Sequence, residues 1–404
     1  MGVWRTWALV VGTIIGSGVF TLPAILAPYG SNSFLGWGVA ACGTLSVAFA
    51  FCHLAGRNPR TGGPHAYVNE AFGRYPAMIV AWGYWISLWV SIAAIATAFS
   101  GYSALFFPII SENTFLSAFV AISAVWLFTY VNLRGIEEAS VVQLVTAILK
   151  LIPLLVIGVV GLLMGDFGSV QAQNPNGESL PVMISGITIL VMFSFIGVEA
   201  ATVPAENIEN PQKTIPRALI LGTLTAATIY IIATAGVMAL IDPGALINST
   251  SPFADAAQMI FGEIGSVFIG VGALIAIGGA LNSNILLTGT VPMAGASDRV
   301  FPAFFKQRNK DGTPVVALVV SSLLTSSVIL INSSKGLLKA FEVMILISTF
   351  CILLAYLGAT LASLKLQFVD RKNGKDIHMP TLINSILAAL FSTFAIIGAW
   401  VIYQ

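Results

Sequence analysis

The chain has 404 residues, of which 57% are hydrophobic and only 9% are charged, whereas soluble domains contain roughly 25% charged residues. This balance excludes a water-soluble fold. The net charge of +1 excludes a large basic surface for nucleic acid, which would need clustered Lys and Arg. Dividing about 230 apolar residues by the roughly 20 that cross the hydrocarbon core predicts on the order of eleven transmembrane helices.

The apolar runs are continuous, which favours helices over the period-two alternation of barrel strands. The predicted spans are 6–28, 34–55, 76–108, 115–133, 139–164, 181–205, 215–241, 264–291, 314–332, 340–364 and 381–403. The sequence therefore predicts an all-α polytopic membrane protein of about eleven transmembrane helices. The cysteines, Cys42, Cys52 and Cys351, lie inside these runs and are expected to be buried as small apolar residues.

Lys and Arg in short loops mark the cytoplasmic side of a membrane protein. With a cytoplasmic N-terminus, only Lys335 and Lys339 fall outside, and Lys150 lies within the fifth span. The other fifteen basic residues fall inside: Arg5, Arg57, Arg60, Arg74, Arg134, Lys213, Arg217, Arg299, Lys306, Arg308, Lys310, Lys365, Arg371, Lys372 and Lys375. This bias predicts a multi-pass topology with a cytoplasmic N-terminus.

Two spans carry internal interruptions near mid-membrane depth. The first contains Gly12, Gly16 and Gly18 with two hydroxyl residues between them, and the sixth runs from Phe193 to Glu199 and holds a carboxylate. Unwound backbone is tolerated in a bilayer only where it is buried in protein or lines a cavity. We therefore expect the first and sixth helices to be broken.

The two interruptions are five spans apart. Because five is odd, they would occupy equivalent places in two halves of opposite topology, which is the inverted-repeat arrangement of secondary transporters. The predicted organisation is a first repeat of five spans at 1–164, a second at 165–367, and an additional C-terminal span at 368–404.

Such a pair of breaks suits an amino acid. Free N–H groups at a half-helix N-terminus favour a carboxylate, and freed carbonyls favour an ammonium group. Gly16, Ser17 and Gly18 would hold the carboxylate, and carbonyls near Ile14, Phe193 and Ile196 would accept the amine. Glycines also occur at helix interfaces to permit close packing, and for either motif alone that alternative stays open.

These segments resemble the amino acid, polyamine and organocation transporter superfamily. The similarity extends to its basic amino acid and polyamine antiporter branch, which includes arginine/agmatine antiporters. The resembling stretches are Gly16-Ser17-Gly18-Val19-Phe20, Ser194-Phe195-Ile196-Gly197-Val198-Glu199, Gly62-Gly63-Pro64-His65-Ala66-Tyr67, Asn210-Pro211, Ile215-Pro216, Ser251-Pro252-Phe253 and Gly312-Thr313-Pro314. The resemblance implies two inverted five-helix repeats, alternating access and usually twelve spans, of which this sequence has eleven.

The resemblance also implies roles for single residues. It assigns Ser17 and Gly18 to the substrate carboxylate, Ile14 and Ile196 to its amine, and Tyr84 and Tyr356 to the site and gate aromatics. Glu199 matches a carboxylate implicated in proton sensing. The arginine carriers have Trp, Asn and Trp where this chain has Phe193, Ile92 and Asn284. Losing a stacked aromatic removes a cation–π contact of about 0.5–2 kcal/mol, so a neutral amino acid fits better than arginine or a polyamine, which remains the alternative.

Lys150 is the one basic residue predicted near the midplane of a span. An ionisable residue there is a functional hypothesis by default, because desolvation disfavours its charged form. In proton-coupled relatives a lysine here stands where sodium-coupled relatives bind a cation. We expect Lys150 to couple transport to a proton; a permanently charged, structural lysine is the alternative. For Glu199 the alternative to gating is a protonated packing residue.

The leading function is therefore a secondary amino acid transporter, by symport or antiport. A membrane enzyme is disfavoured, because His53, His65 and His378 lie far apart in the sequence and no catalytic pattern joins them. A channel or receptor is the third class. No cofactor, metal or nucleic acid is expected; the expected partners are an amino acid substrate, a proton and the lipid bilayer, with a homodimer left open. The expected location is the bacterial inner membrane.

Overall fold

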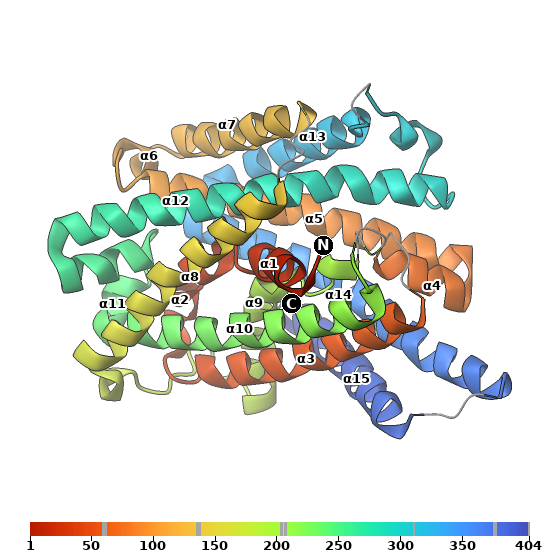
Figure 1. Ribbon diagram of the computed structural model, residues 1–404. Helices are drawn as coiled ribbons and strands as arrows, with labels where there is room; N and C mark the ends of the chain where they lie inside the picture. The colour runs from red at the N-terminus through yellow and green to blue at the C-terminus, as the bar shows by residue number, and fades with distance from the viewer. Residues whose placement is uncertain are drawn as a thin grey trace.

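A computed structural model describes residues 1–58, 63–134, 139–202, 205, 208–309, 312–374 and 378–402. Within these ranges the chain is helical and has no strand beyond one isolated bridge (Figure 1). The α-helices are α1 Val3–Ile14, α2 Ser17–Leu26, α3 Ser33–Arg57, α4 Pro64–Phe72, α5 Arg74–Ser103, α6 Ile109–Glu112, α7 Thr114–Leu133, α8 Ala139–Met164, α9 Leu180–Met192, α10 Pro211–Leu240, α11 Pro243–Leu246, α12 Pro252–Ser297, α13 Val315–Asn332, α14 Leu337–Lys372 and α15 Met379–Ile402.

Nine spans in the described residues are long and apolar enough to cross a membrane. The first of them, Val3–Tyr29, contains both α1 and α2, and two shorter apolar helices, Lys150–Met164 and Leu180–Phe195, lie where the fifth and sixth spans are predicted. The expected all-α polytopic membrane fold is confirmed. Its outer faces carry many exposed Leu, Ile and Phe side chains, as a lipid-facing surface requires.

Two features depart from the expected segments. The helix α4, between the second and third spans, is not an apolar run and was not predicted. The label α12 covers 46 residues that form two helices, which meet at a kink at Gly262 with φ +70° and ψ −165°; the first of them was not among the predicted spans, and the second contains the predicted span 264–291. Cys42 is exposed and Cys52 and Cys351 are half-buried, so the expectation of buried cysteines was wrong for Cys42.

The broken helix α1–α2 lies at the centre of the bundle, where α1 packs against α10 and α8 (Figure 1). On one side α3 runs beside α10, and on the other α7 and α13 pack together next to α12 and α5. The span containing α1 and α2 is the most buried of the nine, because 89% of its apolar stretch lies inside the protein. A break at this position is therefore shielded from lipid.

Small residues bring α8 and α10 into close contact. A Cβ added at Gly161 would lie 2.5 Å from the carbonyl oxygen of Gly236, and one added at Gly158 would lie 2.9 Å from Ala233. The two backbones therefore touch, as small residues permit between transmembrane helices.

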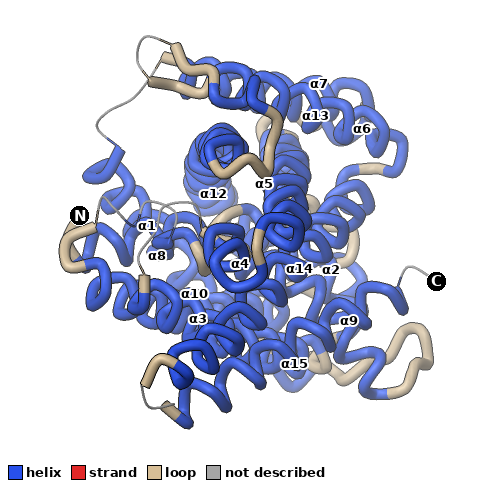
Figure 2. The backbone as a smooth tube through the Cα atoms, turned by 90° about the vertical axis from the view of Figure 1, so that its right-hand side faces the viewer, coloured by secondary structure: helices blue, strands red, loops and turns tan. Residues whose placement is uncertain are grey.

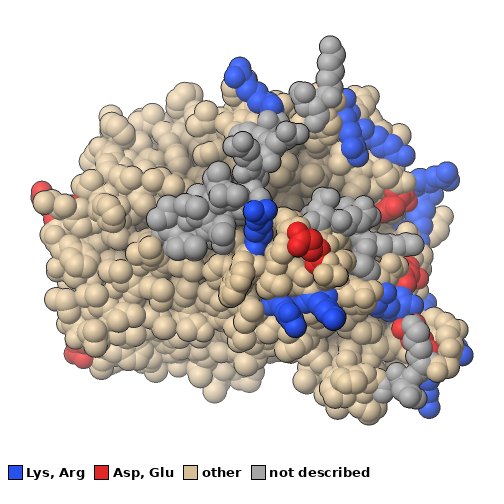
Figure 3. All heavy atoms as spheres, in the orientation of Figure 1, with Lys and Arg blue, Asp and Glu red and all other residues tan. Residues whose placement is uncertain are grey.

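Basic side chains gather at one end of the molecule, the right-hand end of Figure 3, where α4 lies in Figure 1. The Lys and Arg residues at the C-termini of α3 and α14 belong to this basic end, whereas Lys335 and Lys339 follow the opposite end of α13. Of the basic residues that we assigned to the inside, Arg60, Lys310 and Lys375 fall outside the described residues, as does Gly62 of the loop motif.

Candidate substrate site

The first helix is interrupted between Ile14 and Ser17. Ile15 is extended, with φ −79° and ψ 90°, and Gly16 takes φ −117° and ψ −140° before α2 begins. The first N–H groups of α2 have no intrahelical acceptor, so they form a positive end directed at the interruption.

The second interruption follows Met192, where α9 gives way to a 3₁₀ turn at Phe193–Phe195. Ile196 is extended, and Gly197 has φ +106°, a conformation that residues with a Cβ rarely adopt. A Cβ on Gly197 would also lie 2.7 Å from Cγ2 of Thr13. Glycine is needed here for both reasons, and the contact brings the two interruptions together.

A small cavity lies between the two interruptions and is partly open to its surroundings. Three residues from outside the interruptions complete it, namely Ser91 and Ile95 of α5 and Asn284 of α12. The lining residues are Thr13, Ile14, Gly16, Ser17, Gly18, Ser91, Ile95, Phe193, Ser194, Ile196 and Asn284. None of these side chains carries a charge.

Two hydroxyls in this lining, those of Ser17 and Ser194, are buried and have no hydrogen-bond partner. An unpaired buried hydroxyl is costly, so its presence in a cavity indicates a place for a polar ligand. The two serines come from different interruptions, and a Cβ on Gly18 would overlap the Ser194 hydroxyl. The cavity therefore offers free polar groups from both broken helices.

Seven of the eight residues predicted to bind substrate line this cavity: Ile14, Gly16, Ser17, Gly18, Phe193, Ile196 and Asn284. The eighth, Tyr84, is fully buried outside this lining, and its hydroxyl lies near the carboxyl group of Glu199 without a hydrogen bond to it. On α5 the cavity is lined by Ser91 and Ile95 rather than by Ile92, the position singled out from the resemblance.

Glu199 forms a separate buried cluster with two tyrosines. The hydroxyl of Tyr356, from α14, donates to Oε2 of Glu199 over 2.6 Å, and Tyr84 approaches the same carboxyl from α5. All three side chains are at most 1% exposed. The predicted gating residues Glu199 and Tyr356 are therefore in contact, and neither lines the cavity.

Lys150 contacts the first interruption from α8. Its Nζ lies 3.3 Å from the carbonyl oxygen of Gly12 and 3.4 Å from that of Ile15, and the side chain is 6% exposed. The Lys150 ammonium group therefore contacts both the last turn of α1 and the break that follows it.

Sequence reasoning missed Tyr230, which joins the two interruptions. Its hydroxyl, from α10, lies 2.7 Å from the carbonyl oxygen of Ile14 and 3.1 Å from that of Ser194. Its ring packs between Trp37 and Phe195, at centroid distances of 5.4 and 5.8 Å. A tyrosine inside an apolar run gives no local signal of this role, because the role depends on which helices come together.

Comparison with known proteins identifies the family. The amino acid permease family model matches residues 1–404. The chain is 31% identical to the "Putative arginine/ornithine antiporter" of Bacillus subtilis (strain 168), covering 98% of this chain and 91% of that protein. It is 29% identical to the cadaverine/lysine antiporter of Escherichia coli (strain K12), covering 99% and 90%, and 28% identical to the arginine/ornithine antiporter of Pseudomonas aeruginosa PAO1, covering 98% and 84%. The chain therefore belongs to the amino acid permease family and is a multi-pass membrane transporter, not an enzyme.

Proposed function

We propose that the protein is a secondary active transporter that moves a neutral amino acid by alternating access, with the cavity between the two breaks as its binding site. The observation that carries this proposal is the pair of unpaired, buried hydroxyls on Ser17 and Ser194, which face a cavity lined by both interruptions. A small zwitterion supplies the polar groups that such a cavity lacks.

The substrate carboxylate would bind at the start of α2. There the N–H groups of Ser17 and Gly18 and the hydroxyl of Ser17 act together with the positive end of the helix. The substrate amine would bind carbonyls of the interruptions near Ile14, Phe193 and Ile196. The Ile14 carbonyl already accepts from Gly16 N and from Tyr230, so an ammonium group there would share the carbonyl with the tyrosine and leave the Tyr230 bridge in place.

The substrate side chain would contact Phe193, Ser91, Ile95 and Asn284. These residues offer apolar surface, a hydroxyl and an amide, and the lining contains no carboxylate to pair with a guanidinium or a second ammonium group. Burying an unpaired cation is costly, so a neutral side chain fits. The names of the relatives support a second candidate, exchange of arginine, ornithine, lysine or a polyamine.

Coupling to a proton would act through Lys150. When charged, Lys150 donates to the carbonyls of Gly12 and Ile15 and holds the first interruption in its present shape. When neutral, it is a weaker partner for those carbonyls, so loss of its proton would free the break to rearrange. Glu199 and Tyr356 would form the gate on one side of the cavity.

The membrane arrangement is part of the same proposal. The basic end of the molecule would face the cytoplasm, with the N-terminus on that side, in a bacterial inner membrane. Residues 1–164 and 165–367 would form two inverted repeats that rock around the cavity, and 368–404 would add a further span. A homodimer remains a prediction.

The substrate class is tested by thermal unfolding of the purified protein with each of the twenty amino acids and agmatine. A ligand at 100 times its dissociation constant adds about 2.7 kcal/mol, so a neutral amino acid should raise the melting temperature and be taken up by counterflow in proteoliposomes. Stabilisation by arginine or agmatine alone would overturn the neutral assignment. Uptake without counterflow would indicate a channel.

A further inference from the structure

The helix α4 covers the centre of the basic end of the molecule. Figure 2 looks onto that end and shows α4 in front of α5, α14 and α10. The N-terminal half of α4, from Pro64 to Val68, is buried. The ring of Tyr67 in this half lies 6.4 Å from that of Phe51 in α3. A short helix joining two spans thus lies over the interior of the bundle.

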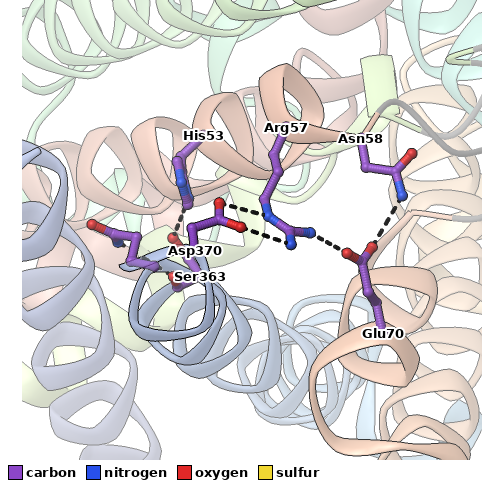
Figure 4. Close-up of polar contacts among 7 residues, drawn as sticks. His53, Arg57, Asn58, Glu70, Ser363 and Asp370 are labelled. Carbon is purple, nitrogen blue, oxygen red and sulfur yellow. Dashed lines mark hydrogen bonds and ion pairs between the residues drawn. The ribbon is translucent and has the colours of Figure 1, made fainter. Parts of the chain in front are cut away.

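One guanidinium group ties this helix to two spans. Arg57, the last residue of α3, donates Nε and Nη2 to the two carboxylate oxygens of Asp370 in α14, over 2.9 and 3.1 Å. Its Nη1 pairs with Glu70 near the end of α4, which also accepts from Asn58 (Figure 4). The three charged side chains are only 17–22% exposed. Charge-assisted bonds in such a partly buried, two-pronged arrangement are stronger than exposed ion pairs.

A second attachment holds the beginning of α4. Nε2 of His65 lies 3.1 Å from Oδ2 of Asp298, at the C-terminus of α12. Arg74, which opens α5, donates to the carbonyl oxygen of Arg299 over 3.0 Å. Therefore α4 is attached at one end to α3 and α14 and at the other to α12, so it bridges helices on both sides of the bundle.

Ring contacts connect α4 to the gate. The ring of Tyr356, which donates to Glu199, lies 6.0 Å from that of Phe51, and Phe51 contacts Tyr67 of α4. The same two helices, α3 and α14, that meet at Phe51 and Tyr356 meet again at Arg57 and Asp370. A movement that parts them at the gate must also strain the ion pairs that hold α4.

We propose that α4 is a latch, held closed by Arg57, which seals the basic end of the transport pathway and must lift before the cavity opens to that side. The latch extends the proposed function, since it acts on the same alternating-access cycle. In the present structure the latch is engaged, and Tyr84, Glu199 and Tyr356 beneath it are fully buried.

The test measures exposure of α4 directly. Ala66, in the buried N-terminal half of α4, is replaced by cysteine in a background where Cys42, Cys52 and Cys351 are alanine, and its reaction with a membrane-permeant maleimide is followed in proteoliposomes. We expect Arg57→Gln to speed this reaction about tenfold, the change that about 1.4 kcal/mol of lost stabilisation produces. Lys372→Gln is the matched control, because it removes one positive charge from the same end of α14 without breaking the latch.

Single-partner variants separate the two attachments of Arg57. Glu70→Gln should speed labelling of Ala66→Cys, whereas Asp370→Asn, which leaves the Arg57–Glu70 pair in place, should speed it less. If Arg57→Gln fails to fold, Glu70→Gln and Asp370→Asn still test the latch, provided that their melting temperatures are unchanged. Equal labelling rates in Arg57→Gln, Glu70→Gln and Lys372→Gln would overturn the latch. Faster labelling in a protein that transports no amino acid would instead overturn the proposed function and leave the latch standing.

Discussion

The bridge formed by Tyr230 permits a sharp test, because its ring makes packing contacts while its hydroxyl makes the hydrogen bonds to the two interruptions. In Tyr230→Phe the contacts with Trp37 and Phe195 remain, and only the hydroxyl is lost. Ile14 O keeps its bond from Gly16 N, so Ser194 O is the carbonyl that loses its donor. One buried carbonyl left without a partner costs about 1–3 kcal/mol. We expect a loss of stability of that size, measured by thermal unfolding.

Transport should fall more than stability alone explains. Without the bridge the two interruptions are no longer held together before the substrate arrives, so binding must order them. If ordering the two interruptions costs about 1.4 kcal/mol, substrate binding weakens tenfold. This would be measured as a raised KM for counterflow in proteoliposomes.

Tyr102→Phe provides the matched control. Tyr102 is also fully buried, and its hydroxyl donates to a carbonyl of α2, that of Phe20, over 2.9 Å, but it does not touch the second interruption. We expect a similar loss of stability and an unchanged KM. If both variants raised KM equally, or if neither did, the assignment of the bridge to substrate binding would be refuted.

Three further substitutions test the other groups at the site. Lys150→Ala should flatten the pH dependence of uptake. An unchanged pH profile in proteoliposomes would refute a role for Lys150 in proton coupling. Glu199→Gln keeps an acceptor for Tyr356 but cannot gain or lose a proton, so we expect slower exchange with nearly normal stability. An unaltered exchange rate and pH profile would remove Glu199 from the gate. Gly18→Ala should abolish ligand-induced thermal stabilisation, because the new methyl group overlaps the Ser194 hydroxyl; stabilisation equal to wild type would mean that the ligand binds elsewhere.

The spans could be predicted because bilayer thickness sets their length and composition. A run such as 115–133 has few alternatives to a membrane helix, and the structure places α7 at Thr114–Leu133. The interruptions could be located from glycines at mid-span, since Gly197 has a positive φ and a Cβ on Gly18 would overlap the Ser194 hydroxyl, so other residues are tolerated poorly at both positions.

The remaining parts depend on how distant helices meet. Tyr230 and Lys150 contact carbonyls of the first interruption that lie more than a hundred residues away in the sequence, and no local pattern specifies those contacts. On α5, a difference of one residue between Ser91 and Ile92 is a rotation of about 100°, which the apolar pattern does not fix on a helix buried on most sides. The helix α4 was missed because it is short and amphipathic, and its attachments come from three other helices.

The close contact of α8 with α10 has a thermodynamic consequence for the first break. Gly12 and Ile15 accept from Lys150 on α8, and Ile14 accepts from Tyr230 on α10, so two helices in backbone contact supply donors to three carbonyls within four residues. Substitutions at Lys150 and Tyr230 should therefore show non-additive free energies, although the two side chains come from different helices. A bulky residue at Gly161, by separating the pair, would reproduce part of both effects without touching either donor.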